Sequence, residues 1–265
     1  MKISNRIFFL ILTFFSLSTL FLKAETSVQT KGNSELYYFK AEGENAKGKT
    51  VVILPGGGYV YHAMDHEGFD WVPFFNNLGI NVAILKYKLP EGDYNIPLND
   101  VKETFRALRE NAHDLNVNPE DIGIMGFSAG GHLASSYATH SSEEKPAFQI
   151  LFYPVISMKS SLTHPGSRDN LLGENPTEEM VVLFSNEEQI NPDTPPAIIF
   201  HSDDDGLVVP ENSINYYLGL NQHKIPASLH IYPSGEHGWG FRESFPYHEA
   251  MLKELETWLS NLNLK

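Results

Sequence analysis

One stretch of the sequence decides the fold: Asp121-Ile122-Gly123-Ile124-Met125-Gly126-Phe127-Ser128-Ala129-Gly130-Gly131-His132-Leu133-Ala134. Its first half is a short apolar run, which is typical of a buried strand. After Ser128 the residues become small and then apolar at helical spacing, so a helix is expected to begin there. The stretch therefore predicts a strand, a sharp turn and a helix, with Ser128 at the turn.

Residues 126–130 within this stretch form the motif G-x-S-x-G. Between a strand and a helix, this motif is the nucleophile elbow of α/β-hydrolases. Gly126 and Gly130 relieve crowding around a strained backbone, and the helix N-terminus directs N–H groups at a developing oxyanion. Ser128 is therefore predicted to be a nucleophile. The alternative is a glycine-rich turn that only connects a strand to a helix.

Strand and helix patterns alternate on both sides of this stretch, which predicts a mostly parallel sheet covered by helices on both faces. Residues 156–196 are the exception, being rich in Ser, Asn, Pro and Glu. We expect this segment to be a cap-like insertion over the site. The expected strands are 36–40, 50–54, 82–87, 122–127, 148–153, 197–200 and 228–231, and the expected helices are 69–78, 99–115, 133–139, 214–220 and 247–262.

The first residues have the pattern of a secretory signal peptide. Lys2 and Arg6 precede an apolar run over 7–22, and the small residue Ala24 follows. The run has 16 residues, fewer than the ~20 of a membrane-spanning helix. The sequence thus predicts a cleaved leader over 1–24, an α/β-hydrolase domain over 25–265, and a secreted or periplasmic protein. An uncleaved membrane anchor is the alternative.

Charge and composition restrict the partners. The net charge is −14, and loss of Lys2, Arg6 and Lys23 with the leader makes it −17. Such a surface repels nucleic acid and anionic lipid, so we expect no nucleic-acid partner and, once the leader is cleaved, no stable membrane partner. The chain has no cysteine, which excludes a lipoprotein anchor, disulfides and a cysteine nucleophile.

A serine nucleophile needs a histidine base and an acid that orients it, and in this fold they follow in the order serine, acid, histidine. His237 lies among glycines after the last expected strand, whereas most other histidines lie on strand or helix patterns. Three aspartates, 203–205, follow the strand 197–200. The acid is expected four residues beyond a histidine at the strand end, and the count from His201 reaches Asp205, with Asp204 as the alternative.

A second glycine-rich turn, Pro55-Gly56-Gly57-Gly58-Tyr59, follows the strand 50–54. In α/β-hydrolases this place holds the other half of the oxyanion hole. The turn lacks the Gly-Lys-Ser/Thr of a phosphate-binding loop and the spacing of a dinucleotide site.

A faint metal-like pattern follows the glycine turn. His62, Asp65, His66 and Glu67 faintly match an inverted zinc-protease motif, but an aspartate replaces the glutamate and Gly68 follows at once. We therefore expect no metal here, and place this loop at the rim of the acyl pocket or in a structural role.

Five motifs occur together in order. They are Pro55-Gly56-Gly57-Gly58-Tyr59, His66-Glu67-Gly68, the stretch 126–134, Val209-Pro210-Glu211-Asn212-Ser213 and His237-Gly238-Trp239-Gly240. Together they resemble the acetyl xylan esterase and feruloyl esterase-like group of α/β-hydrolases, over about 51–258. The resemblance implies Ser128 as nucleophile, Asp205 as acid and His237 as base, with oxyanion donors from the backbone of Gly57, Gly58 and Ala129 and no cofactor. Gly206-Leu207 departs from the Lys-Val that is common in the family, which leaves room for Asp204.

The function implied by the resemblance is that of a serine esterase acting on a carbohydrate ester, with acetyl as the first expectation and feruloyl as the second. A peptidase with the same triad is an alternative. A non-catalytic carbohydrate-binding relative is another, although it would have lost a triad member. Four aromatic residues are candidates for stacking on a sugar or aromatic acyl group, with core packing as the other interpretation: Tyr59, Tyr61, Trp239 and Phe241.

Overall fold

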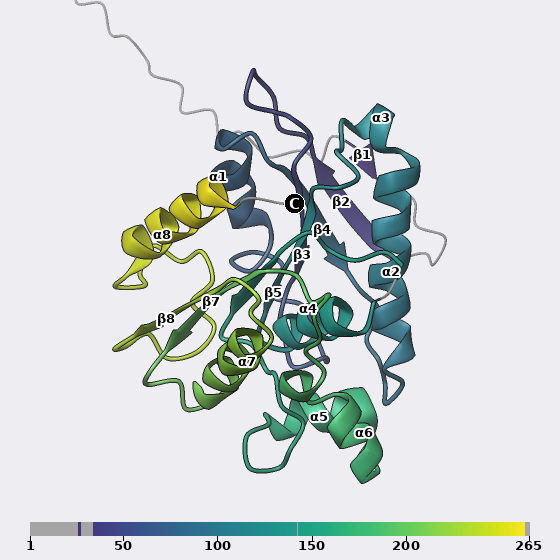
Figure 1. Cartoon of the computed structure of the whole chain (residues 1–265), viewed down its shortest axis with the longest axis vertical. Coiled ribbons are helices and arrows are strands. Elements are labelled where there is room, and N and C mark those ends of the chain that lie inside the picture. The colour runs from purple at the N-terminus through teal and green to yellow at the C-terminus, as the bar shows by residue number, and fades with distance from the viewer. Residues whose placement is uncertain (1–25, 28–33, 142, 263–265) are drawn as a thin grey trace, which may run out of the picture.

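The computed structural model describes residues 26–27, 34–141 and 143–262, whose strands form one eight-stranded sheet (Figure 1). The strand order is β1-β2-β4-β3-β5-β6-β7-β8. Strands β3 to β8 run parallel, while β2 is antiparallel to β4 and β1 is antiparallel to β2. The predicted mostly parallel α/β-hydrolase sheet is confirmed. The strands are β1 (Thr26–Ser27), β2 (Glu35–Phe39), β3 (Thr50–Leu54), β4 (Asn81–Lys86), β5 (Ile122–Phe127), β6 (Gln149–Phe152), β7 (Ala197–Ser202) and β8 (Ala227–Tyr232).

Helices cover both faces of the sheet and create two cores. One face carries α2 (Asn95–Glu110), α3 (Ala112–Leu115), α4 (Ser128–His140) and α7 (Glu211–Gln222), and the other carries η1 (Phe69–Trp71), α1 (Val72–Asn77) and α8 (His248–Asn261) (Figure 1). Successive strand side chains point to opposite faces: Val52 and Leu54 of β3 belong to the first core, and Val51 and Ile53 to the second. Strands buried on both faces explain the continuous apolar runs in the sequence.

Two helix predictions need correction. The helix expected over 69–78 is a 3₁₀ turn followed by α1, which has Pro73 in its first turn, where a missing N–H is tolerated. The helix expected over 99–115 begins earlier, at Asn95, and breaks at Asn111. The Asn111 side chain donates to the Ala107 carbonyl at 2.8 Å, a local bond that competes with the continued helix.

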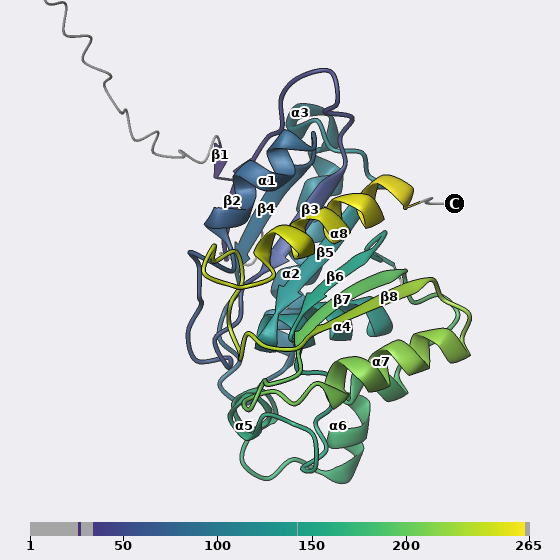
Figure 2. The ribbon, with the colours of Figure 1, turned by 90° about the vertical axis from the view of Figure 1, so that its left-hand side faces the viewer.

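The insertion over 156–196 is more regular than expected. It contains α5 (Pro165–Leu172), α6 (Glu178–Leu183) and η2 (Asn186–Glu188), and α5 and α6 lie together at the lower end of the molecule in both views (Figure 2). Its polar residues cap the short helices, because the side chains of His164 and Thr177 accept the backbone N–H of Ser167 and Met180. We call this segment the cap.

The predicted leader over 1–24 lies outside the described residues. In the described part of the chain, no helix combines the length and the apolar character that crossing a bilayer requires.

Candidate active site

The candidate site lies where several parallel strands end. The loop after β3 carries the glycine-rich turn, the turn after β5 carries Ser128, and the loops after β7 and β8 carry Asp205 and His237. Since the carboxyl ends of parallel strands meet at one edge of a sheet, residues far apart in the sequence meet there. Ligands of open α/β sheets bind at this edge.

The turn at Ser128 is strained and needs its glycines. Ser128 has φ = 51° at the start of α4, a left-handed conformation that is uncommon for a non-glycine residue. A Cβ on Gly126 would lie 2.3 Å from the Gly130 carbonyl oxygen, and one on Gly130 would lie 2.2 Å from that of Leu54. The motif glycines are therefore required by close backbone contacts on both sides of the serine.

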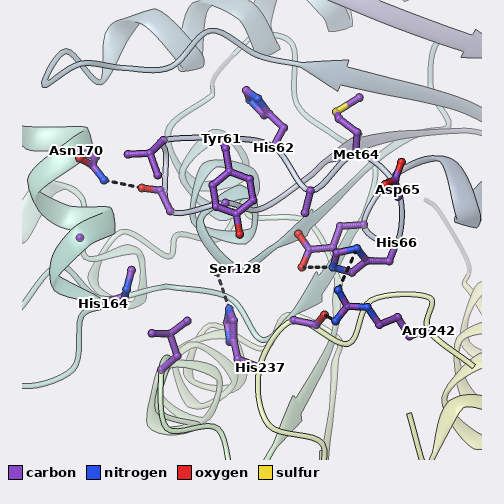
Figure 3. Close-up of a pocket in the computed structure, with 18 residues that line it drawn as sticks. Tyr61, His62, Met64, Asp65, His66, Ser128, His164, Asn170, His237 and Arg242 are labelled. Atoms are coloured by element: carbon purple, nitrogen blue, oxygen red, sulfur yellow. Dashed lines mark hydrogen bonds and ion pairs between the residues drawn. The ribbon is translucent and has the colours of Figure 1, made fainter. Parts of the chain in front are cut away.

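The structure brings Ser128, His237 and Asp205 into one hydrogen-bonded chain. Ser128 Oγ lies 2.8 Å from His237 Nε2 (Figure 3), and His237 Nδ1 lies 2.6 Å from Asp205 Oδ2. The carboxylate accepts from Nδ1–H, which leaves Nε2 free to accept the serine proton. This is the arrangement that a serine nucleophile, its base and an orienting acid require.

Asp205 is fixed by several donors. Its side chain is buried, and Oδ1 accepts the backbone N–H groups of Leu207 and Val208, both at 2.9 Å. Oδ2 also lies 3.2 Å from His201 Nε2. Burial on its own raises the pKa of a carboxyl group, but the hydrogen bonds from His201 and His237 outweigh it and hold the pKa of Asp205 well below its usual range. Asp205 is therefore an ionised acceptor at neutral pH.

The neighbouring aspartates have other surroundings. Asp204 is exposed, and its Oδ1 accepts the Glu236 backbone N–H at 2.8 Å. Asp203 is also exposed. Of the three, the structure brings Asp205 to His237, while Asp204 ties the loop after β7 to the loop that carries His237.

The predicted oxyanion donors lie beside Ser128. Gly57 and Gly58 line the same cavity as Ser128, and Ala129 follows it in the first turn of α4. The glycine turn is held from two sides: the Gly57 carbonyl accepts the N–H groups of Val60 and Tyr61, and the Gly58 carbonyl accepts the side-chain amide of Asn170 from the cap at 2.8 Å (Figure 3). Donation to an oxyanion by these three residues stays a prediction.

Ser128 and His237 line a cavity of about 680 Å³. At its rim are three exposed apolar side chains, Val60, Tyr61 and Leu207, of which Tyr61 is 62% exposed. Histidines, Asp65 and Arg242 line other parts of the wall, and α5 contributes Gly166 and Asn170. The cavity is therefore mixed in character, with the cap forming one wall.

The four aromatic candidates are placed differently. Tyr59 and Trp239 are buried, and the Phe241 ring lies edge-on to the Trp71 ring, with centroids 5.0 Å apart. Core packing is therefore the interpretation that fits these three. Tyr61 alone of the four presents an exposed ring to the cavity.

The residues of the metal-like pattern make contacts of different kinds, and His66 Nε2 lies 4.0 Å from Glu67 Oε1. The His62 ring lies 4.5 Å from the Tyr87 ring, and the Glu67 carboxylate accepts hydrogen bonds from Gly56 and Tyr153. The loop lines the cavity, which agrees with the first of its two predicted roles, a place at the rim of the acyl pocket. The sequence reasoning missed the contacts of Glu67 and Tyr153. The motif His66-Glu67-Gly68 was the one signal that pointed at Glu67.

This fold and this serine–histidine–aspartate arrangement define an α/β-hydrolase. The BD-FAE family model matches residues 36–220, and the chain belongs to this family. Over 224 residues it is 43% identical to the acetylxylan esterase of Xylanibacter ruminicola, covering 83% of this chain and 47% of that protein. It is also 35% identical over 211 residues to endo-1,4-β-xylanase B of Butyrivibrio fibrisolvens, covering 74% and 33%.

The chain thus spans about half or less of the length of these curated relatives. Among solved structures, the acetyl ester-xyloside bifunctional hydrolase of Caldicellulosiruptor lactoaceticus has a TM-score of 0.80 and 34% identity, covering 86% of this chain and 87% of that one. The family resemblance inferred from the motifs is confirmed.

Proposed function

We propose that this chain is a serine carboxylesterase that removes acetyl groups from a plant polysaccharide such as xylan. The observation that carries the proposal is the chain of hydrogen bonds from Ser128 through His237 to Asp205. The acetylxylan esterase and the acetyl ester-xyloside hydrolase among its relatives support the choice of substrate.

The first half of the reaction acylates the serine. Ser128 Oγ attacks the ester carbonyl carbon while His237 Nε2 takes its proton, and Asp205 stabilises the imidazolium that forms. When the tetrahedral intermediate collapses, the carbon–oxygen bond to the sugar breaks. His237 gives its proton to the leaving sugar oxygen, which departs as an alcohol, and the acyl group stays on Ser128.

The second half returns the enzyme to its starting state. A water molecule attacks the acyl-enzyme as His237 takes its proton. The bond between Ser128 Oγ and the acyl carbon breaks, His237 reprotonates the serine, and acetate leaves. The chemistry uses protein groups and water alone. In both halves, backbone N–H groups of Gly57 or Gly58 and of Ala129 stabilise the oxyanion, each by about 3 kcal/mol.

The cavity supports a substrate larger than its acyl group. A volume of about 680 Å³ exceeds the needs of a two-carbon acetyl group and leaves room for sugar. The exposed ring of Tyr61 at the rim suits the apolar face of a pyranose. The same volume admits an aromatic acyl group, which makes a feruloyl ester the second candidate.

Secretion is part of the proposal. Residues 1–24 have the pattern of a signal peptide, and a polymeric polysaccharide is met outside the cytoplasm. We propose that the mature chain begins after Ala24 and acts in the periplasm or outside the cell.

Hydrolysis of 4-nitrophenyl acetate and of acetylated xylan by the wild type and by Ser128→Ala tests the function. The wild type should release acetate from both substrates, and the variant should lose several orders of magnitude in kcat. Full activity in Ser128→Ala would refute the proposal.

A further inference from the structure

Glu67 is a buried carboxylate that the triad does not use. Glu67 is 3% exposed, and it lines the same cavity as Ser128 and His237. Burying a carboxyl group without partners is strongly unfavourable. Glu67 has two hydrogen-bond partners among the described residues, and His66 Nε2 also lies 4.0 Å from its Oε1.

The two carboxylate oxygens hold two different loops. Oε2 accepts the Gly56 backbone N–H at 2.7 Å, inside the glycine-rich turn 55–59, which we call the oxyanion loop. Oε1 accepts the Tyr153 hydroxyl at 2.8 Å. The Tyr153 oxygen in turn accepts the Gly240 N–H at 2.9 Å, in residues 235–241, which we call the base loop because it carries His237.

Other contacts show how close this network is to the reacting groups. A Cβ on Gly56 would lie 2.8 Å from Glu67 Oε2 and 2.9 Å from Ser128 Cβ. The Tyr153 ring lies edge-on to the His237 ring, with centroids 4.8 Å apart. Burial and the neighbouring Glu67 raise the pKa of Tyr153 well above its usual value, so its hydroxyl keeps its proton and donates.

We propose that Glu67 is a positioning residue that, with Tyr153, fixes the oxyanion loop and the base loop relative to Ser128. The inference rests on the proposed function. Gly57 and Gly58 directly follow the residue that Glu67 holds, and His237 lies three residues before the one that Tyr153 holds. The oxyanion donors and the histidine base must both lie within a fraction of an ångström of the positions that the reaction requires, and a displacement of 1 Å costs about a hundredfold in rate. Loss of the network should therefore lower kcat rather than raise KM.

Four variants test the network. In Glu67→Gln the side-chain oxygen can still accept from Gly56, but its NH₂ group cannot accept from the Tyr153 hydroxyl, so the Tyr153 proton loses its charged acceptor. Glu67→Leu loses both bonds. Tyr153→Phe and the double variant Glu67→Gln/Tyr153→Phe complete a cycle. We expect kcat on 4-nitrophenyl acetate to fall about tenfold in Glu67→Gln and about a hundredfold in Glu67→Leu, with KM within about twofold. The double variant should be no slower than its slower parent, because both changes break one network.

Rates are taken per active site, counted by labelling Ser128 with an organophosphonate. A purely structural role for Glu67 would reduce the labelled fraction and leave kcat per labelled site at the wild-type value, and that result would overturn the inference. Asp100→Asn is the matched control: this carboxylate is equally buried and accepts the Lys88 backbone N–H at 2.7 Å, but it does not line the cavity. It should lower the unfolding midpoint with kcat per labelled site unchanged.

Two further outcomes are separable. If Glu67→Leu does not fold, Glu67→Gln and Tyr153→Phe decide the question, and wild-type kcat per site in both would overturn the inference. Wild-type protein that hydrolyses neither ester and is not labelled would overturn the proposed function, and this inference with it.

Discussion

Replacing Asp205 by asparagine should almost abolish activity, although the side chain keeps its size. The amide oxygen of the new side chain would stay with the N–H groups of Leu207 and Val208, where Asp205 Oδ1 now accepts two bonds. Its NH₂ group would then face His237 Nδ1, which lies 2.6 Å from Oδ2. A donor at that place favours the tautomer with its hydrogen on Nε2, and this tautomer cannot take the proton of Ser128.

In a serine protease the equivalent change costs about 10⁴ in kcat, or about 5 kcal/mol of transition-state stabilisation. We expect a loss of that size for Asp205→Asn at pH 7 on 4-nitrophenyl acetate. The matched control is Asp204→Asn, whose amide oxygen can still accept the Glu236 N–H in an exposed position. It should stay within about threefold of the wild type. Equal losses in the two variants, or a larger loss in Asp204→Asn, would refute the assignment of Asp205.

Three other outcomes are expected. Tyr61→Ala should raise KM for acetylated xylan about three- to tenfold and leave 4-nitrophenyl acetate hydrolysis unchanged, whereas Leu218→Ala, an exposed change on α7 away from the cavity, should alter neither. Gly130→Ala should lower the free energy of unfolding by about 1–3 kcal/mol, measured by urea titration, since its Cβ would lie 2.2 Å from a backbone carbonyl oxygen. Gly206→Ala, where no atom of the described residues beyond its two chain neighbours lies within 4 Å of the added Cβ, should leave the free energy of unfolding unchanged. The pKa of Asp205 is lowered in the folded protein, so as the pH falls the unfolded chain binds a proton at this carboxylate before the folded chain does. The contribution of Asp205 to stability is therefore present above about pH 4 and is lost as the pH falls through the folded-state pKa. Urea titrations from pH 6 to pH 3 should show the fall, and Asp205→Asn should show a shallower one. An equally steep fall of the free energy of unfolding in Asp205→Asn would contradict this contribution of Asp205 to stability.

The parts of the fold that could be predicted are those with strong local patterns. Strands such as β3 and β5 are buried on both faces, so their residues are apolar without interruption. The serine turn was predictable because its crowded backbone demands glycine at fixed positions. The count from His201 favoured Asp205 over Asp204, but the choice needed the structure, since three adjacent aspartates have no local pattern that separates them.

The parts that could not be predicted depend on contacts between distant residues. Glu67 and Tyr153 are 86 positions apart, and nothing in either neighbourhood indicates the other. The cap has short helices of 8 and 6 residues, too short for a clear apolar period. Their ends are set by side-chain caps such as that of Thr177 and by packing against the rest of the molecule.

The left-handed backbone at Ser128 creates a trade-off between stability and activity. Glycine adopts φ = 51° without strain. A glycine at position 128 would therefore stabilise the fold but remove the proposed nucleophile. A Ser128→Gly chain should therefore resist heat better than the active protein while it can no longer form an acyl-enzyme. Such a chain should keep the cavity and its walls, which makes it a suitable trap for an uncleaved glycan ester and a direct test of the proposed substrate.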